Sequence, residues 1–129
     1  MPELSARKPR PIWYNLSLLN LPVPGLVSIF HRISGVLLAI AIAGMLYFLD
    51  GSLKSEADFA QVRSELSHPI VKLMALGILW AFSHHLFAGI RYLFLDLGKG
   101  IGLPAARATG FVVFGVSGLL TLVLGAKLW

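Results

Sequence analysis

The sequence predicts an all-α membrane protein with three transmembrane helices. Of its 129 residues, 57% are hydrophobic and only 13% are charged, whereas a soluble domain carries about 25% charged residues. A transmembrane helix needs roughly 20 mainly apolar residues, and three stretches provide them, at about 26–49, 69–95 and 106–128. With residues 1–25 and short connections they form a single membrane-anchor domain, 1–129, which leaves no room for a soluble catalytic domain.

Charge and cysteine content exclude several functions. The net charge is +5, but the 11 Lys and Arg residues stand at the ends of apolar segments and do not form the continuous basic face of a nucleic-acid-binding protein. We therefore expect no nucleic-acid partner. The chain has no cysteine, so disulfides, iron–sulfur ligation and thiolate metal sites are excluded. Metal chemistry is left to the four histidines, namely His31, His68, His84 and His85.

Residues 1–25 are predicted to form an irregular segment at the membrane surface. Pro22 and Pro24 interrupt a continuous helix, so the first span is expected to begin near Leu26. The apolar run that follows is far longer than the apolar core of a signal peptide. We therefore expect this segment to remain uncleaved and to lead directly into the first span.

Residues 50–68 form the polar loop between the first two spans, since they contain four of the six acidic residues. Ser55 and Asp58, three residues apart, give a weak capping signature for a short helix lying at the membrane interface. Pro69 suits the first turn of the second span.

The distribution of charge predicts the orientation of the chain. Basic residues occupy the N-terminal segment and the second connection, where Lys99 and Arg107 lie, and the acidic loop is on the opposite side. The positive-inside rule then places the N-terminus in the cytoplasm and the C-terminus in the periplasm. A bacterial inner membrane is favoured over the mitochondrial inner membrane because an Arg- and Ser-rich presequence is lacking.

Polar residues cluster at the entrance of the first span. Ser28 lies three residues before His31 and four before Arg32, so all three can present hydrogen-bonding groups to one small volume. Ionisable groups inside a span are costly and usually mark function. The cluster suits a quinone carbonyl or an anionic carboxylate; the alternative is a snorkelling arginine beside an interfacial histidine.

His84 and His85 lie deep in the second span. His85 is ten residues before Leu95, roughly 15 Å along a helix and so about halfway across a hydrocarbon core of roughly 30 Å. A histidine at this depth needs a partner. It is either a neutral side chain hydrogen-bonded to a neighbouring helix or an axial haem ligand.

The neighbours of each histidine on the helix favour His85 as the haem ligand. Its row along the helix contains only small residues, Gly77, Ala81 and Gly89, and a flat macrocycle needs such a groove to approach the imidazole. His84 shares its row with the bulky Trp80. We expect His84 to have a secondary role, such as a contact to a haem propionate or to a partner helix.

A six-coordinate haem needs a second ligand that this chain does not offer at the same depth. His31 is near the interface and His68 lies outside the second span. The second imidazole is therefore expected from another polypeptide. Arg32 and Arg91 lie toward the cytoplasmic side, where they can neutralise haem propionates, although Arg91 is equally suited to Asp96 or a lipid phosphate.

Two motifs resemble those of a known family. The segment Ser28-Ile-Phe-His31-Arg32-Ile-Ser34-Gly35 is similar to the S-I-x-H-R-x-[ST]-G signature of the cytochrome b membrane-anchor subunits of succinate dehydrogenase. The segment from His85 to Asp96 resembles their H-x-x-x-G-x-R-H-x-x-x-D signature, with Tyr92 in place of the second histidine, and Arg10-Pro11 matches their usual opening. The resemblance covers nearly the whole chain.

The resemblance implies a subunit of complex II that does not itself oxidise succinate. Its partners would be a flavoprotein, an iron–sulfur protein and a second membrane anchor, all held at a lipid bilayer. It implies that His85 ligates haem b, with the other ligand from the second anchor. His31 and Arg32 would contact the haem propionates, and Ser28 and Arg32 would line the site where ubiquinone is reduced.

Three alternatives remain. The chain is also compatible with the anchor of a quinol:fumarate reductase, in which similar subunits catalyse the reverse reaction. A cofactor-free transporter or assembly subunit is the second, although no acidic residue lies within the predicted spans to complete a proton relay. The third is a purely structural scaffold, in which apolar replacements of His85 and Arg32 would be harmless.

Overall fold

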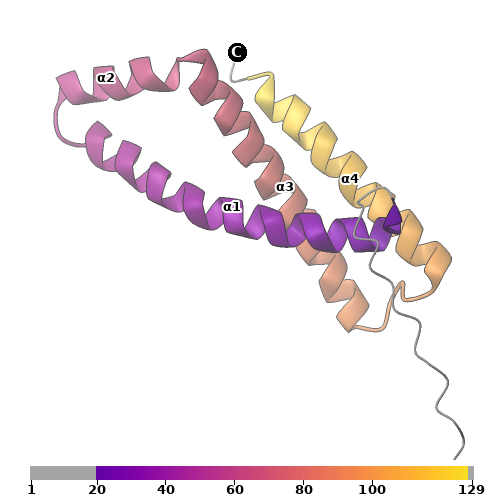
Figure 1. Cartoon of the computed structure of the whole chain (residues 1–129). Helices are drawn as coiled ribbons and strands as arrows, with labels where there is room; N and C mark the ends of the chain where they lie inside the picture. The colour runs from indigo at the N-terminus through magenta and orange to yellow at the C-terminus, as the bar shows by residue number, and fades with distance from the viewer. Residues whose placement is uncertain (1–19, 128–129) are drawn as a thin grey trace, which may run out of the picture.

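The computed structural model describes residues 20–127, which form four helices and no strand (Figure 1). Helix α1 covers Val23–Ser52, α2 covers Glu56–Leu66, α3 covers Pro69–Asp96 and α4 covers Leu103–Gly125. Helices α1, α3 and α4 are long and apolar enough to cross a membrane. The three predicted spans are therefore confirmed as helices.

Prolines set the start of each long helix. Helix α1 begins at Val23, three residues before the predicted start, with Pro24 in its first turn. A proline is tolerated there because the first amides of a helix have no intrahelical acceptor. The prediction of irregular structure up to residue 25 is thus wrong for residues 23–25. The rest of that predicted segment, including Arg10-Pro11, lies outside the described residues except for residues 20–22.

The short helix α2 joins the first two spans as predicted. Its N-cap is Ser55, whose hydroxyl oxygen accepts a hydrogen bond from the amide of Asp58 at 3.1 Å. This bond satisfies one of the free amides at the helix N-terminus. Helix α3 then begins at Pro69, again with the proline in the first turn.

Helices α3 and α4 pack along each other, and α1 crosses α3 and then diverges from it toward α2 (Figure 1). The buried face of α4 consists mainly of small residues, and small residues allow close helix approach in a membrane. Its two buried hydroxyls donate to carbonyls of their own helix, Ser117 to Val113 and Thr121 to Ser117. Neither hydroxyl is left unpaired in the apolar interior.

The core of the chain is small. Val27, Ala88 and Val113, one from each long helix, form its buried apolar centre. Gly35, Ala39 and Ala43 recur every four residues on α1, a spacing that predicts a face in contact with another helix. Only Gly35 makes that contact: it is partly buried against His85, whereas Ala39 and Ala43 are exposed. Much of α1 beyond the crossing therefore presents an apolar surface that the other described helices do not cover.

Candidate functional site

His31 of α1 and His85 of α3 meet where the two helices cross. Their rings are stacked, with centroids 4.1 Å apart and planes inclined by 10°. Tyr92, two turns after His85, makes a T-shaped contact with the His31 ring, with a centroid distance of 5.2 Å. The two motifs, more than 50 residues apart in the sequence, are thus brought together at one site.

The Nδ1 atom of His85 is held by helix α1. It lies 3.1 Å from the main-chain oxygen of His31 and 3.2 Å from the hydroxyl oxygen of Ser34. The Ser34 hydroxyl donates to the same carbonyl at 2.9 Å. Since a carbonyl can only accept, this contact assigns the proton to Nδ1 and leaves the lone pair of Nε2 available. Metal-binding histidines are typically oriented in this way.

A glycine gives the His85 ring its place against α1. A Cβ atom at position 35 would lie 3.1 Å from Cε1 of His85, closer than ordinary van der Waals contact. Gly89 is less important for this packing, because a Cβ there would be 3.8 Å from Nε2 of His31, an ordinary van der Waals distance. The close approach of α1 to the imidazole therefore depends mainly on Gly35.

Ser34 and Gly35 belong to the first motif, but their contacts with His85 were not predicted from the sequence. Ser34 is fully buried at the helix crossing. One signal was present, since Ser34 lies three residues after His31 and therefore on a neighbouring part of the same helix face.

His84 is enclosed in the core of this chain. It is fully buried and stacks on Trp80 with centroids 5.2 Å apart, with Phe114 and Phe30 as further ring neighbours. Neither of its ring nitrogens has a hydrogen-bond partner within residues 20–127. Of the two secondary roles predicted, the structure favours contact with neighbouring helices, and these are α1 and α4 of the same chain.

Ser28 and Arg32 lie one turn apart on α1, on either side of His31 along the chain. Arg32 is exposed, and it makes no hydrogen bond or ion pair within the described chain. Ser28 is half-buried. Both side chains therefore have no polar partner among residues 20–127, and both lie on α1 close to His31.

Arg91 turns away from the histidine pair and toward α4. Its Nε donates to the hydroxyl of Thr109 at 3.0 Å, and its Nη2 donates to the carbonyl of Ala106 at 3.2 Å. No ion pair joins it to Asp96 in the described part of the chain. Of the expected roles for Arg91, the pairing with Asp96 is wrong, and these contacts do not support the one at a propionate.

Three helices long and apolar enough to cross a membrane, with an oriented imidazole where α1 crosses α3, define a small multi-pass membrane protein. Over residues 6–124 the chain matches the family described as the succinate dehydrogenase/fumarate reductase transmembrane subunit. The chain belongs to this family. The resemblance read from the two motifs is therefore confirmed.

Relatives of similar length share about a third of the sequence. The succinate dehydrogenase cytochrome b556 subunit of Coxiella burnetii is 35% identical over 93% of this chain and 97% of its own length. The subunit of the same name from Paracoccus denitrificans is 32% identical over 89% and 91%. The succinate dehydrogenase cytochrome b560 subunit of Reclinomonas americana is 31% identical over 88% and 83%.

Proposed function

We propose that this chain is the membrane-anchor cytochrome b subunit of a succinate dehydrogenase that reduces ubiquinone. One observation carries the proposal, namely the fixed Nδ1 of His85, which leaves Nε2 as a ligand atom at the crossing of α1 and α3. The names of the relatives support the same assignment. The proposed partners are a flavoprotein, an iron–sulfur subunit and a second membrane anchor.

His85 is the proposed axial ligand of haem b. Its Nδ1 is held by a carbonyl, its ring is accommodated by Gly35, and it is partly exposed rather than enclosed like His84. These features fit a haem ligand, and bound haem b supplies reversible one-electron transfer. His31 is stacked face to face on His85, so its ring stands beside the proposed ligand and would not complete the ligand set. The other axial ligand is therefore assigned to the second anchor.

Arg32 and His31 are the proposed contacts of the haem propionates. Arg32 offers five N–H donors on an exposed guanidinium, and His31 stands beside the proposed ligand. A carboxylate near a cation in a membrane gains more from pairing than it does in water, because the local dielectric constant is lower.

Ser28 and Arg32 are proposed to line the quinone site. Within the helices, Ser34, Ser83 and Ser117 each donate to a carbonyl of their own helix, but Ser28 makes no such bond in the described chain. Its hydroxyl is thus available to donate to a quinone oxygen. Arg32 would stabilise the negative charge that develops on the ring oxygens as electrons arrive.

Replacement of the two neighbouring histidines tests the haem assignment. We expect His85→Ala to abolish or shift the b-type absorbance of the purified complex, whereas His84→Ala should largely keep it. The measurement is a reduced-minus-oxidised spectrum, with the partner polypeptides identified in each preparation. An unchanged spectrum in the assembled His85→Ala complex would refute the assignment.

The Arg32→Ala variant tests the quinone assignment. We expect it to lower succinate:quinone activity by at least ten-fold, while succinate oxidation with an artificial dye continues, because the dye accepts electrons before the membrane subunits. Removing one transition-state donor typically costs about 100-fold or more. Arg63→Ala, which removes an exposed cation from α2, serves as the control. Wild-type quinone turnover in Arg32→Ala would rule out this role.

A quinol:fumarate reductase anchor is the second candidate, because the family description names both enzymes. The quinone extracted with the purified complex, and the faster direction of turnover, distinguish the two. For either enzyme we propose a bacterial inner membrane, with the N-terminus and the α3–α4 connection on the cytoplasmic side. A complex that lacks both haem and flavoprotein would instead favour a transporter or assembly subunit.

A further inference from the structure

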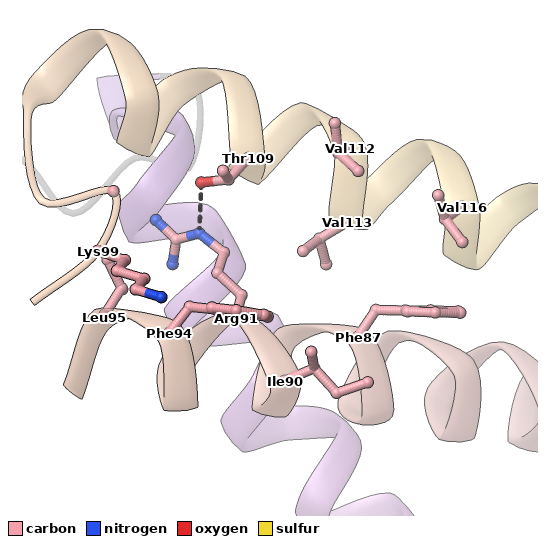
Figure 2. A pocket seen from close by; sticks show the side chains of 11 residues that line it. Phe87, Ile90, Arg91, Phe94, Leu95, Lys99, Thr109, Val112, Val113 and Val116 are labelled. Atoms are coloured by element: carbon pink, nitrogen blue, oxygen red, sulfur yellow. Dashed lines mark hydrogen bonds between the residues drawn. The ribbon is translucent and has the colours of Figure 1, made fainter. Parts of the chain in front are cut away.

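A groove of about 470 Å³ lies between α3 and α4, near the connection that joins them (Figure 2). This volume is in the range of small-molecule binding sites. Apolar side chains from both helices form its walls: Phe87, Ile90 and Phe94 from α3, and Val112, Val113 and Val116 from α4.

Two cations stand at the end of the groove that is nearest the connection. Arg91 reaches from α3 across to Thr109 of α4, and Lys99 follows in the connection (Figure 2). Arg91 is only 7% exposed, and its two hydrogen-bond acceptors are a hydroxyl and a carbonyl, both neutral. No carboxylate pairs with either cation within residues 20–127.

The burial of Arg91 indicates what kind of ligand the groove would bind. A buried charge is costly unless it is paired, and neutral acceptors compensate only part of the lost hydration. The groove therefore combines an uncompensated positive charge with an apolar channel. That combination complements a molecule with one anionic group and an attached apolar chain.

The position of the groove along the helices matches the depth of a lipid head group. Arg91 lies five residues before the end of α3 at Asp96, about 7.5 Å along the helix. Its guanidinium is therefore near the end of the span, where head groups lie. Phe87 and Val116, at the far end of the groove, lie further into each helix.

We propose that the α3–α4 groove binds one anionic phospholipid. The phosphate lies against Arg91 and Lys99, and one acyl chain follows the apolar walls toward the middle of the membrane. Basic pockets between transmembrane helices are suited to anionic head groups, and each nearby Lys or Arg contributes to the attraction. The site is separate from the His31–His85 pair, so it does not depend on the proposed haem or quinone chemistry.

Native mass spectrometry of the purified, delipidated complex tests the proposal. The probes are phosphatidylglycerol and phosphatidylcholine with identical acyl chains. We expect one phosphatidylglycerol to be retained per copy of this chain in preference to phosphatidylcholine. Lys99→Gln should weaken that retention about five-fold. Lys99 is chosen because Arg91 also ties α3 to α4, and its loss risks the fold.

A second variant tests the apolar walls of the groove independently of the two cations. Val112→Trp fills the groove and leaves both cations in place, so we expect it to abolish the retention of phosphatidylglycerol. Two controls should bind lipid like the wild type. Val123→Trp places the same residue on α4 outside the groove, and Arg107→Gln removes a cation from the same end of α4 that does not line the groove.

Three outcomes would overturn the proposal. The first is equal retention of the two lipids, and the second is unchanged phosphatidylglycerol binding in Val112→Trp. The third is the loss of a protein subunit from the Val112→Trp complex without any change in bound lipid, which would assign the groove to a partner helix. The haem spectrum is recorded throughout, because a lipid-specific loss leaves it unchanged.

Discussion

Because Gly35 has no side chain, α1 can approach His85 closely. We predict that Gly35→Ala lowers the haem content of the complex, because the new Cβ would lie 3.1 Å from Cε1 of His85 and would displace the ring. Changes around a metal ligand typically reduce metal affinity about 10- to 100-fold. The haem-to-protein ratio and the reduced spectrum of the purified complex measure this effect.

Gly44→Ala is the matched control for that experiment. It introduces the same methyl group on the same helix, but a Cβ at position 44 would have no neighbour within 4 Å in the described chain. Equal haem content in the two variants would show that Gly35 does not position His85.

His84 differs from its neighbour because it carries two buried nitrogens without hydrogen-bond partners in residues 20–127. We predict that His84→Leu leaves the stability of the complex unchanged or raises it. An unsatisfied buried polar group costs about 1–3 kcal/mol, and its removal offsets the loss of the stacking on Trp80. The thermal denaturation midpoint of the complex is the measurement.

Thr109 provides a comparison for His84, because its hydroxyl group is hydrogen-bonded. Thr109→Val removes the acceptor of the Arg91 Nε donor, so that variant should lower the denaturation midpoint by several degrees. If His84→Leu destabilises the complex as much as Thr109→Val does, the imidazole has a hydrogen-bond partner outside residues 20–127.

Sequence spacing was enough to favour His85 over His84, because the two residues occupy different rows of one helix. It was not enough to find the carbonyl of His31 as the partner of Nδ1. That contact joins residues 54 apart in the chain, and it depends on where α1 crosses α3. A periodic pattern reports the face of a helix but not the point at which another helix meets that face.

At the scale of the helices, α1 and α4 are brought together by Gly110. A Cβ at that position would lie only 2.7 Å from Cγ1 of Val23, and a β-branched side chain cannot easily rotate away. We predict that Gly110→Ala destabilises the bundle by about 1–3 kcal/mol, the usual cost of overpacking. Thermal denaturation of the assembled complex measures it.

Two other glycines of α4 provide comparisons for Gly110. Gly115→Ala should be neutral, since no atom of the described chain lies within 4 Å of its Cβ. Gly125→Ala should have an intermediate effect, because its Cβ meets the flexible end of Leu76. An equal effect of all three substitutions would mean that helix propensity rather than packing governs the result.

The type and number of the membrane-spanning helices were predictable, because each span is a long apolar run. The predicted starts of α1 and α4 were wrong for a local reason. Pro24 and Pro104 lie inside the first turns of α1 and α4, where a proline begins a helix rather than interrupting it. The predicted start of α4 at residue 106 was therefore late by three residues, as was that of α1.

At the scale of the whole molecule, a large apolar surface of α1 is left uncovered by the rest of residues 20–127. Large apolar side chains of α1 beyond the crossing, such as Val36 and Ile40, are more than 60% exposed, and lipid or another subunit must cover them. We predict that the chain produced without the proposed second anchor enters the membrane but retains little of the proposed haem. Co-production of the second anchor should restore the b-type absorbance, and full haem occupancy of the lone chain would contradict the prediction.

The arrangement of the helices could not be predicted from their sequences. Three apolar spans are compatible with several packings, and hydropathy alone does not distinguish the face that meets a helix from the face that meets lipid. The small residues of α1 illustrate the difficulty, since Gly35 contacts α3 but Ala39 and Ala43, on the same row, do not.

Val27, Ala88 and Val113 hold the three long helices together, and neither His31 nor His85 belongs to that cluster. Replacement of either histidine therefore leaves this apolar centre intact. We expect removal of the proposed haem to leave α1, α3 and α4 packed against one another, so that haem content and helix packing can be measured separately.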